Sequence, residues 1–353
     1  MTGYFRNNIA RLQGYVPGYQ PVGEEYLKLN TNENPYPPAP GVRTTLRKAD
    51  PFLLRRYPDP VLNRLRDRIA DTLGFARDDI LVGNGSDEIL TIVTRSFVGE
   101  GDRVAFPEPS YSLYPILVRI QGGEPVGVAL AEDFSLPEEF IDIPAALKFL
   151  AFPNSPTGTV YPLDTVERLL NSSPGIVLVD EAYADFAEVN CLGLLSRHPN
   201  LIILRTFSKS YGLAGLRVGF ALASPELIAG MMKVKDSYNL NQLSAGAAEA
   251  AMADQAYFQA VLKKIVRERE RFRDSLDRLG IASYPSSTNF VLARFDSAEQ
   301  ARTTFEQLRE KRILVRYFDL PRLRECLRIT IGTPEAMDQL VQALEEIRGD
   351  QTR

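Results

Sequence analysis

The stretch TFSKSYGLAGLRVGF at residues 206–220 decides how the fold of this chain is interpreted. It places Lys209 among hydroxyls, three glycines and one arginine, directly after the apolar run LIIL at 201–204. A short apolar run of this kind is typical of a buried strand. A lysine that follows such a strand is either a solvated loop charge or a reactive amine. The residues around this stretch decide between the two interpretations.

Short apolar runs alternate with amphipathic stretches from about residue 60 to 225. Buried strands are indicated by ILVG, RVAF, LKFLAF, GIVLVD, LIILR and VGFALA, and helical spacing by NRLRDRIADTLG, DEILTIVTRSFV and LDTVERLLN. This alternation predicts an α/β domain with a mostly parallel central sheet, whose ligand site lies at the carboxyl ends of the strands. We expect residues 30–250 to form this large domain.

The pattern changes near residue 250. A charged amphipathic helix ends at Gly280 and is followed by NFVLARF, a helix, ILVRYF, LRITIG and a last helix. Thr333-Pro334 is a favourable start for that last helix, because threonine caps helices and proline suits the first helical position. We therefore predict a small α+β domain made of residues 251–353 together with residues 1–29.

The composition excludes several classes of protein. The 353 residues carry a net charge of -4, which leaves no basic footprint for nucleic acid, and no stretch is apolar enough to span a membrane. The first residues lack an apolar signal core, so we expect a cytoplasmic protein. Cys191 and Cys326 are too few for a disulfide framework or a zinc cluster. The single histidine, His198, excludes multi-histidine metal sites, and we expect no metal.

Five polar segments follow predicted strands, so the fold should gather them at one edge of the sheet. GNGSDE at 83–88 is a glycine turn that opens a helix, where the amides of Ser86 and Asp87 can bind a phosphate. Tyr111 of FPEPSYSLY can lay its ring on a flat ligand. In AFPNSPTG, Asn154 and Ser155 can hydrogen-bond a phenolic oxygen.

The other two segments carry charge. GIVLVDEAYADF ends its apolar run at Asp180, whose burial requires a cationic partner, either an arginine or a protonated pyridine nitrogen. Tyr183 follows three residues later. Lys209 can form an imine, and groups for a phosphate come from Thr206, Ser208 and Arg217. Together the five segments suit a phosphorylated pyridine aldehyde, so Lys209 is predicted to be a reactive amine.

The set GNGSDE, NSPTG, VDEAY and SKSYGLAGLRVGF, in this order over most of the chain, resembles the fold-type-I pyridoxal-phosphate aminotransferases. The resemblance implies that Lys209 binds the cofactor aldehyde, that Asp180 keeps the pyridine nitrogen protonated and that Tyr183 bonds the ring hydroxyl. It implies that Tyr111 stacks on the ring. It also implies that the cofactor phosphate is held by Ser86, Asp87, Thr206, Ser208 and Arg217.

One position departs from the family pattern. The family usually has asparagine immediately before the proline of the NSPTG loop, where this sequence has Ser155. Asn154 stands one place earlier. Either residue is therefore a candidate for the contact with the ring hydroxyl.

KLNTNENPYPP at 28–38, RRYPDP at 55–60, ILVRYF and CLRITIGT make the chain most similar to the histidinol-phosphate aminotransferase family. The similarity implies reversible transfer of the amino group of L-histidinol phosphate to 2-oxoglutarate, which gives imidazole-acetol phosphate and L-glutamate in histidine biosynthesis. It implies a homodimer with shared sites, in which Tyr57 reaches the cofactor phosphate of the neighbouring subunit. Substrate would be bound by Tyr19, Asn34, Arg316 and Arg328, whose guanidiniums suit an anionic group.

Three other functions are compatible with part of the pattern. An aromatic or broad-range amino-acid aminotransferase would keep Lys209 and bind a carboxylate with Arg328. A threonine-phosphate decarboxylase shares the cofactor motifs, although ENPY is not expected in its N-terminal segment. A regulator with an aminotransferase-like domain would carry a DNA-binding module ahead of that domain, and we expect none because few residues precede KLNTNENPY.

Overall fold

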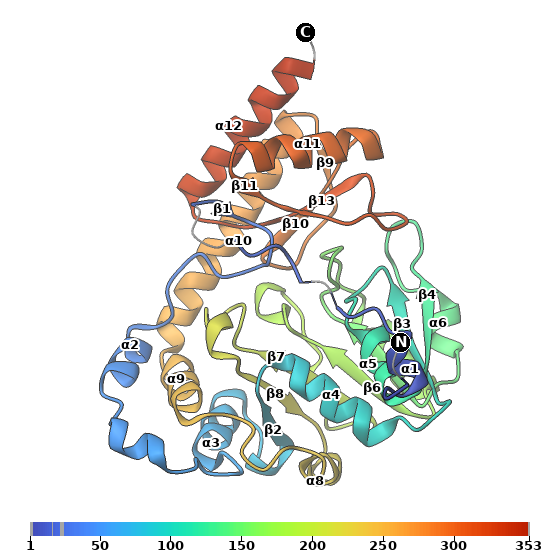
Figure 1. The fold of residues 1–353 in the computed structure, drawn as a ribbon, viewed down its shortest axis with the longest axis vertical. Coiled ribbons are helices and arrows are strands. Elements are labelled where there is room, and N and C mark those ends of the chain that lie inside the picture. Colours follow the sequence, from blue (N-terminus) through green and yellow to red (C-terminus); the bar gives the residue numbers. More distant parts are fainter. Residues whose placement is uncertain (1–2, 16, 22–24, 352–353) are drawn as a thin grey trace.

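The computed structural model describes residues 3–15, 17–21 and 25–351, and its larger sheet has seven strands in the order β2-β8-β7-β6-β5-β3-β4 (Figure 1). β8 runs antiparallel to both of its neighbours, while the other paired strands are parallel. The predicted α/β fold with a mostly parallel central sheet is confirmed. The strands are β2 (Ile80–Gly83), β3 (Arg103–Glu108), β4 (Glu124–Ala129), β5 (Leu147–Ala151), β6 (Ile176–Asp180), β7 (Leu201–Thr206) and β8 (Gly219–Leu222).

The period of two along each strand sends alternate side chains to opposite faces of this sheet. Leu178 and Ile202 pack in one cluster with residues of α4, α5 and α8, whereas Val177 and Ile203 pack in another with α7. A third cluster joins β2 and β8 to α3 and α9. The helices are α2 (Pro40–Arg47), α3 (Asn63–Leu73), α4 (Ser86–Phe97), α5 (Tyr114–Gln121), α6 (Glu138–Asp142), α7 (Leu163–Ser172), α8 (Pro225–Met232) and α9 (Gln242–Ala253).

β4 has no counterpart among the predicted strands. It is half exposed, pairs only with β3 and contains Pro125 and Gly127, so it presents no continuous apolar run. Proline is tolerated at a sheet edge because its missing N–H is not needed there. An edge strand of this kind is therefore hard to distinguish from a loop by its pattern.

The smaller sheet has four antiparallel strands in the order β12-β13-β10-β9 and lies above the larger one in Figure 1. The segment ILVRYF is divided: β11 pairs with β1 of the N-terminal segment, and β12 pairs with β13. The four strands of this sheet are β9 (Ala282–Ser283), β10 (Phe290–Arg294), β12 (Arg316–Tyr317) and β13 (Cys326–Thr330), while β1 (Leu27–Lys28) and β11 (Ile313–Leu314) form a separate two-stranded sheet.

Three helices surround this smaller sheet, α10 (Gln255–Arg278), α11 (Ala298–Glu310) and α12 (Pro334–Gln351). The hydroxyl of Thr333 accepts a hydrogen bond from the N–H of Ala336 at 3.3 Å, so the predicted cap is present. Two of the three start on a side-chain cap as well, from Asp254 and Ser297. Over the described ranges, no helix combines the length and apolar character needed to cross a membrane.

The N-terminal segment contacts both the larger and the smaller part of the molecule. The short α1 (Asn7–Ala10) lies beside α5 (Figure 1), where the Asn8 side chain donates to the carbonyl of Arg119 at 2.8 Å. β1 instead joins the smaller unit through β11. The limits of the two domains, at residues 29/30 and 250/251, remain our proposal. The remaining elements are the one-turn helices η1 (Pro51–Arg55), η2 (Arg77–Asp79), η3 (Ala184–Phe186), η4 (Leu192–Leu194) and η5 (Ala214–Leu216).

Candidate active site

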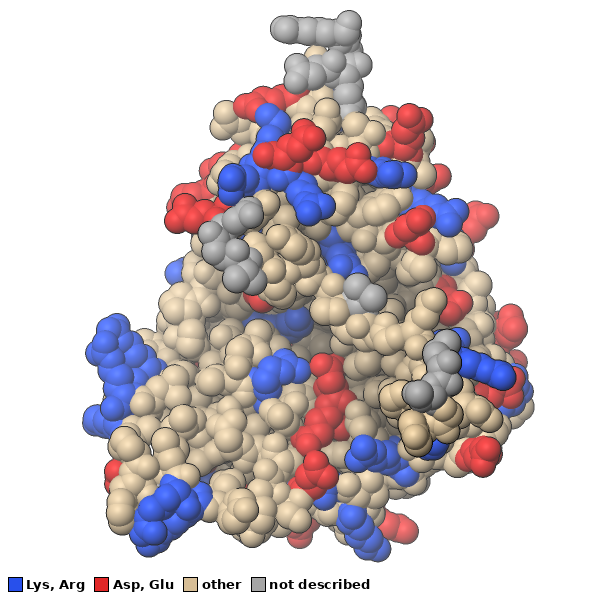
Figure 2. Space-filling model, viewed as in Figure 1, with Lys and Arg blue, Asp and Glu red and all other residues tan. Residues whose placement is uncertain are grey.

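A cavity of about 260 Å³ lies where the carboxyl ends of the large parallel strands face β12 and β13. In Figure 2 a hollow opens between the part that carries α11 and α12 and the larger part below it, with atoms of Lys or Arg visible inside. Most of the predicted site residues line this cavity: Ser86, Asp87, Tyr111, Ser155, Asp180, Tyr183, Thr206, Ser208, Lys209, Arg217, Arg316 and Arg328.

One end of the cavity is a cup of hydrogen-bond donors at the start of α4. A Cβ on Gly85, which has a φ of +84°, would lie 2.6 Å from Nη2 of Arg217. A Cβ on Gly219 would lie 2.6 Å from the amide nitrogen of Ser86. The two glycines therefore keep space beside an arginine and a helix N-terminus, which is the donor set that binds phosphate.

The hydroxyls that complete this cup come from the end of β7. Oγ1 of Thr206 donates to Oγ of Ser208 at 3.0 Å, and both residues line the cavity. Nη2 of Arg217 lies 3.2 Å from Oδ2 of Asp87 in a half-exposed ion pair. Asp87 thereby holds the guanidinium at the mouth of the cup.

Asp180 ends β6 and is buried on the floor of the cavity. Its carboxylate accepts hydrogen bonds from the hydroxyl of Tyr114 at 2.8 Å and from the N–H of Ala182 at 3.1 Å. Burial raises the pKa of Asp180 to about 6, although these two hydrogen bonds act in the opposite direction. No lysine, arginine or histidine in the described ranges forms an ion pair with it. A cationic ligand atom would supply the missing charge.

Lys209 projects into the cavity from the loop after β7. Its Nζ donates to the carbonyl of Thr31 at 3.2 Å and lies 5.9 Å from the ring centre of Tyr183. The hydroxyl of Tyr183 accepts a hydrogen bond from Nδ2 of Asn32 at 2.9 Å. The amine is therefore close to a phenol that faces the same space.

Tyr111 lines the cavity between the cup and Asp180. Its hydroxyl donates to Oδ1 of Asp87 at 3.1 Å, and its ring packs edge-on against Tyr114. Burial raises the pKa of Tyr111 far above its usual range, so its hydroxyl remains a donor. The Tyr111 ring is thus held by the hydrogen bond of its hydroxyl and by its contact with the Tyr114 ring.

The structure separates the two candidates in the NSPTG loop. Asn154 is buried away from the cavity, where its Nδ2 donates to the carbonyl of Pro109 at 3.0 Å and its Oδ1 accepts from Ser110 at 2.9 Å. Ser155 lines the cavity, and its Oγ accepts a hydrogen bond from Nη1 of Arg328 at 3.1 Å. Of the two, Ser155 is the residue that a ligand in the cavity can reach.

Two arginines face the cavity from the smaller sheet, since Arg316 on β12 pairs directly with Arg328 on β13. Nη2 of Arg328 donates to the carbonyl of Asn30 at 3.1 Å, and its Nε has no hydrogen-bond partner among the described residues. Burial lowers the pKa of Arg328, and the neighbouring Arg316 adds to this effect. Among the residues that the structure describes, the hydrogen-bond partners of Arg328 are neutral, so an anion would suit this end of the cavity.

Besides Asn154, three predicted residues lie outside the cavity. The Tyr19 ring packs against Tyr26, with ring centres 6.4 Å apart, and borders a smaller neighbouring cavity. Asn34 holds the lysine loop, because its Nδ2 donates to the carbonyls of Lys209 at 3.1 Å and Ser210 at 2.9 Å. Tyr57 is 79% exposed.

Several cavity residues were not predicted: Tyr15, Asn30, Thr31, Asn32 and Tyr114. Asn30, Thr31 and Asn32 belong to the KLNTNENP segment, whose run of polar side chains was the available signal that this segment could line a ligand site. Tyr114 follows Tyr111 by three residues and begins α5, and its N–H donates to the carbonyl of Tyr111 at 3.2 Å, so a turn brings the two rings together. No pattern in the sequence distinguishes Tyr15 from Tyr19.

Comparisons with known proteins agree with this geometry. A family described as aminotransferase class I and II matches residues 24–344. A histidinol-phosphate aminotransferase 1 from Nostoc sp. is 42% identical over 98% of this chain and 99% of its own length. A histidinol-phosphate aminotransferase from Citrifermentans bemidjiense is 44% identical over 97% of this chain and 98% of its own.

A solved structure gives the same result for the fold. The crystal structure of histidinol-phosphate aminotransferase from Sinorhizobium meliloti, in complex with pyridoxal-5'-phosphate, superimposes with a TM-score of 0.89. It is 30% identical in sequence, and the match covers 98% of each chain.

Proposed function

The chain belongs to the aminotransferase class I and II family, and on this premise we propose that it transfers the amino group of L-histidinol phosphate to 2-oxoglutarate with pyridoxal phosphate as cofactor. The products are imidazole-acetol phosphate and L-glutamate, and the reaction is a step of histidine biosynthesis. The observation that carries the proposal is the Arg316 and Arg328 pair, which faces the same cavity as Lys209 and Asp180.

The cavity residues fit pyridoxal phosphate at each of its functional groups. The glycine-lined cup with Ser86, Thr206, Ser208 and Arg217 suits the phosphate, and Asp180 suits a protonated ring nitrogen. Tyr111 can cover the ring, and Tyr183 and Ser155, which also line the cavity, would bind the ring hydroxyl. When bound, this cofactor supplies an aldehyde that takes up an amino group and a ring that withdraws electrons from the reacting carbon.

Lys209 serves as both anchor and general acid/base in this proposal. Its Nζ would hold the cofactor aldehyde, and the same amine is the group that would take up and return a proton at the reacting carbon. Asp180 would keep a proton on the ring nitrogen, because a buried carboxylate is stabilised by the positive charge that the proton confers.

The two arginines orient the substrate. A phosphate offers enough oxygen atoms for both guanidiniums, and the second substrate, 2-oxoglutarate, offers a carboxylate. Ser155 and the Asn30 carbonyl hold Arg328 in place by its two Nη atoms. Since the anionic end lies away from the reacting carbon, this binding energy serves to position the amine beside Lys209.

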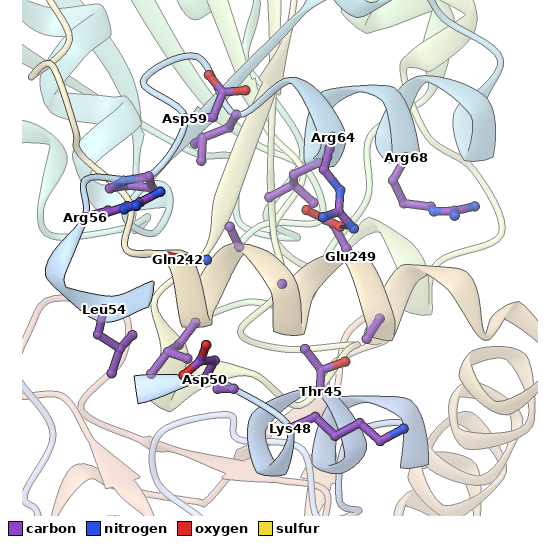
Figure 3. A pocket seen from close by; sticks show the side chains of 18 of the residues that line it. Thr45, Lys48, Asp50, Leu54, Arg56, Asp59, Arg64, Arg68, Gln242 and Glu249 are labelled. Carbon is purple, nitrogen blue, oxygen red and sulfur yellow. Dashed lines mark ion pairs between the residues drawn. The ribbon is translucent and has the colours of Figure 1, made fainter. Parts of the chain in front are cut away.

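A homodimer with shared sites is part of the proposal. Figure 3 shows a groove of about 680 Å³ that α2, η1, α3 and α9 line, with Lys48, Arg56, Arg64 and Arg68 among its side chains. Exposed apolar side chains gather beside it, among them Phe52, Leu54 and the stacked rings of Tyr57 and Tyr238. Apolar patches of this kind support association.

In the dimer, Tyr57 would lie at the cofactor phosphate of the partner subunit. We place the enzyme in the cytoplasm, and the two buried free thiols of Cys191 and Cys326 are compatible with that reducing compartment.

The proposal is tested by the two half-reactions. The protein loaded with pyridoxal phosphate is titrated with L-histidinol phosphate and, separately, with L-phenylalanine, while the visible absorption band of the cofactor is followed. Loss of the band at low histidinol phosphate, and its return with 2-oxoglutarate, is the expected result. Stronger loss with phenylalanine would instead assign an aromatic aminotransferase. Release of carbon dioxide from O-phospho-L-threonine, supplied in a separate reaction, would assign a threonine-phosphate decarboxylase.

The variant Lys209→Ala should be unable to show either half-reaction. Its expected loss is about 10⁴-fold, the upper range for removal of a general acid/base. Lys263→Ala, an exposed lysine on α10, is the matched control and should retain full activity.

A further inference from the structure

A group of charged and polar side chains, three of them buried and Asp185 half-buried, lies behind the cavity and does not line it. We call it the Asp185 network: Glu181, Arg205, Asp185 and Ser210. Glu181 follows Asp180 directly, Arg205 precedes Thr206 at the end of β7, and Ser210 follows Lys209. The network therefore touches the backbone of three cavity residues without touching a ligand.

The network begins with a strong ion pair. Arg205 donates from Nε at 2.9 Å and from Nη2 at 2.7 Å to Oε2 of Glu181. Oε1 of Glu181 accepts the N–H of Cys191. Burial alone would lower the pKa of Arg205, but Glu181 and Asp185 outweigh it and raise the pKa, so the guanidinium stays charged. Bonds of this kind fix the orientation of both side chains.

Asp185 extends the network to the lysine loop. Its Oδ1 accepts a hydrogen bond from Nη1 of Arg205 at 3.2 Å, and its Oδ2 accepts one from Oγ of Ser210 at 2.5 Å. The Asp185 carboxylate is thus a bridge between β7 and the residue that follows Lys209. The opposite side of the same loop is held by Asn34, through the carbonyls of Lys209 and Ser210.

The Lys209 side chain depends on this backbone support. Within the described part of the chain, its Nζ has one hydrogen bond, to the carbonyl of Thr31. A long side chain with one weak hydrogen bond is placed mainly by its Cα position, and a displacement of about 1 Å can reduce a rate by about 10²-fold. The groups that fix the peptide on each side of Lys209 therefore decide where the amine lies.

We propose that Asp185 is a positioning residue for Lys209, acting through Ser210 and held in place by Arg205 and Glu181. The inference rests on the proposed function for the role of Lys209, while the support of the lysine loop by Asp185 stands on the geometry alone.

The test uses Ser210→Ala, Asp185→Asn and the double variant, since truncating Arg205 would leave Glu181 unpaired in the core and threaten folding. Ser275→Ala is the matched control, because Ser275 is as buried as Ser210, at 3% exposure each, and its hydroxyl bonds only within α10. Activity, the visible circular dichroism of the bound cofactor and hydrogen exchange of the apoprotein are measured for each.

Each single variant should lower kcat by about tenfold with KM changed less than about twofold, and the double variant should be no worse, because both residues act through one bond. The circular dichroism band should weaken, since it depends on how the cofactor is held at Lys209. In the apoprotein, amides in 206–212 should exchange about tenfold faster. Ser275→Ala should change none of these three readouts.

The proposal is overturned if Ser210→Ala and Asp185→Asn lose thermal stability but keep the circular dichroism band, the exchange pattern and kcat of the wild type. It is also overturned if the losses of the single variants multiply in the double variant. Failure of the proposed function has a separate signature: the wild type would lack the visible band, while the exchange of 206–212 would still report on Asp185.

Discussion

Asp180 and Arg328 are both buried charges that face one cavity, yet they belong to different sheets and carry opposite signs. Asp180 ends a strand of the seven-stranded sheet and receives two hydrogen bonds from neutral donors. Arg328 lies within β13 of the smaller sheet and donates two hydrogen bonds to neutral oxygens. Burial shifts both pKa values toward the uncharged form, upward for Asp180 and downward for Arg328.

The difference shows that the two ends of the cavity favour ligand groups of opposite charge. A buried charge without a counter-charge is unfavourable, so a protein retains one where a ligand supplies the partner. The part of the cavity around Asp180, here called the sheet end, suits a cation on a flat ring. The part around Arg316 and Arg328, here called the arginine end, suits an anion. The cofactor would thus supply the positive charge that Asp180 needs, and the substrate the negative charge that Arg328 needs. Substitution of Asp180 or of Arg328 removes one of these two needs at a time.

The largest effect is expected at the sheet end. Asp180→Asn keeps the shape of the side chain but removes the charge that holds a proton on the ring nitrogen. We expect kcat/KM to fall by about 10³-fold, comparable to the loss of one preorganised electrostatic group. Single-turnover rates with L-histidinol phosphate measure it, and Asp274→Asn on the exposed side of α10 is the control. A loss below tenfold would show that the cofactor nitrogen does not depend on Asp180.

A smaller effect is expected at the arginine end. Arg328→Ala should raise KM for L-histidinol phosphate by about 10²-fold while kcat changes less, because a charge-assisted contact to a bound group contributes about 1.5–3 kcal/mol. Arg324→Ala is the control, since Arg324 is exposed on the neighbouring loop and pairs with Asp319. An unchanged KM with a lowered kcat would place Arg328 in the chemistry of the ring instead.

The smallest effect concerns the stability of the apoprotein. Because the folded-state pKa of Asp180 is about 6 and its ordinary value is 3.8, protonation stabilises the fold below pH 4 and this contribution is lost as pH rises through 6. The difference corresponds to at most roughly 3 kcal/mol. Asp180→Asn should therefore gain thermal stability relative to wild type between pH 4.5 and 7.5. A constant difference across that range would contradict the shift.

The sheet end of the site was predictable from sequence and the arginine end only in part. Asp180 follows an apolar run directly, Ser86 and Lys209 follow theirs within a few residues, and a parallel sheet brings such positions to one edge. Arg316 and Arg328 carry no comparable local signal. They were identified by resemblance, and their direct pairing depends on the register of β12 and β13.

Positions in irregular segments were the hardest to place. Tyr19 was expected over the substrate, whereas Tyr15 lines the cavity and Tyr19 packs beside it. Residues without helical or strand periodicity have no preferred face in the sequence, so only tertiary packing distinguishes them. The choice between Asn154 and Ser155 was open for the same reason, because a proline-rich loop does not reveal which side chain turns inward.

The most direct test of the division between the two ends compares L-histidinol phosphate with L-histidinol, which lacks only the phosphate. Both are titrated into the protein loaded with pyridoxal phosphate, and the loss of the visible band is followed for wild type and Arg328→Ala. We predict that wild type responds to the phosphate ester at about 10²-fold lower concentration, and that the variant largely loses this preference. Equal response of the wild type to both compounds, or an unchanged preference in the variant, would contradict the assignment of the arginine end.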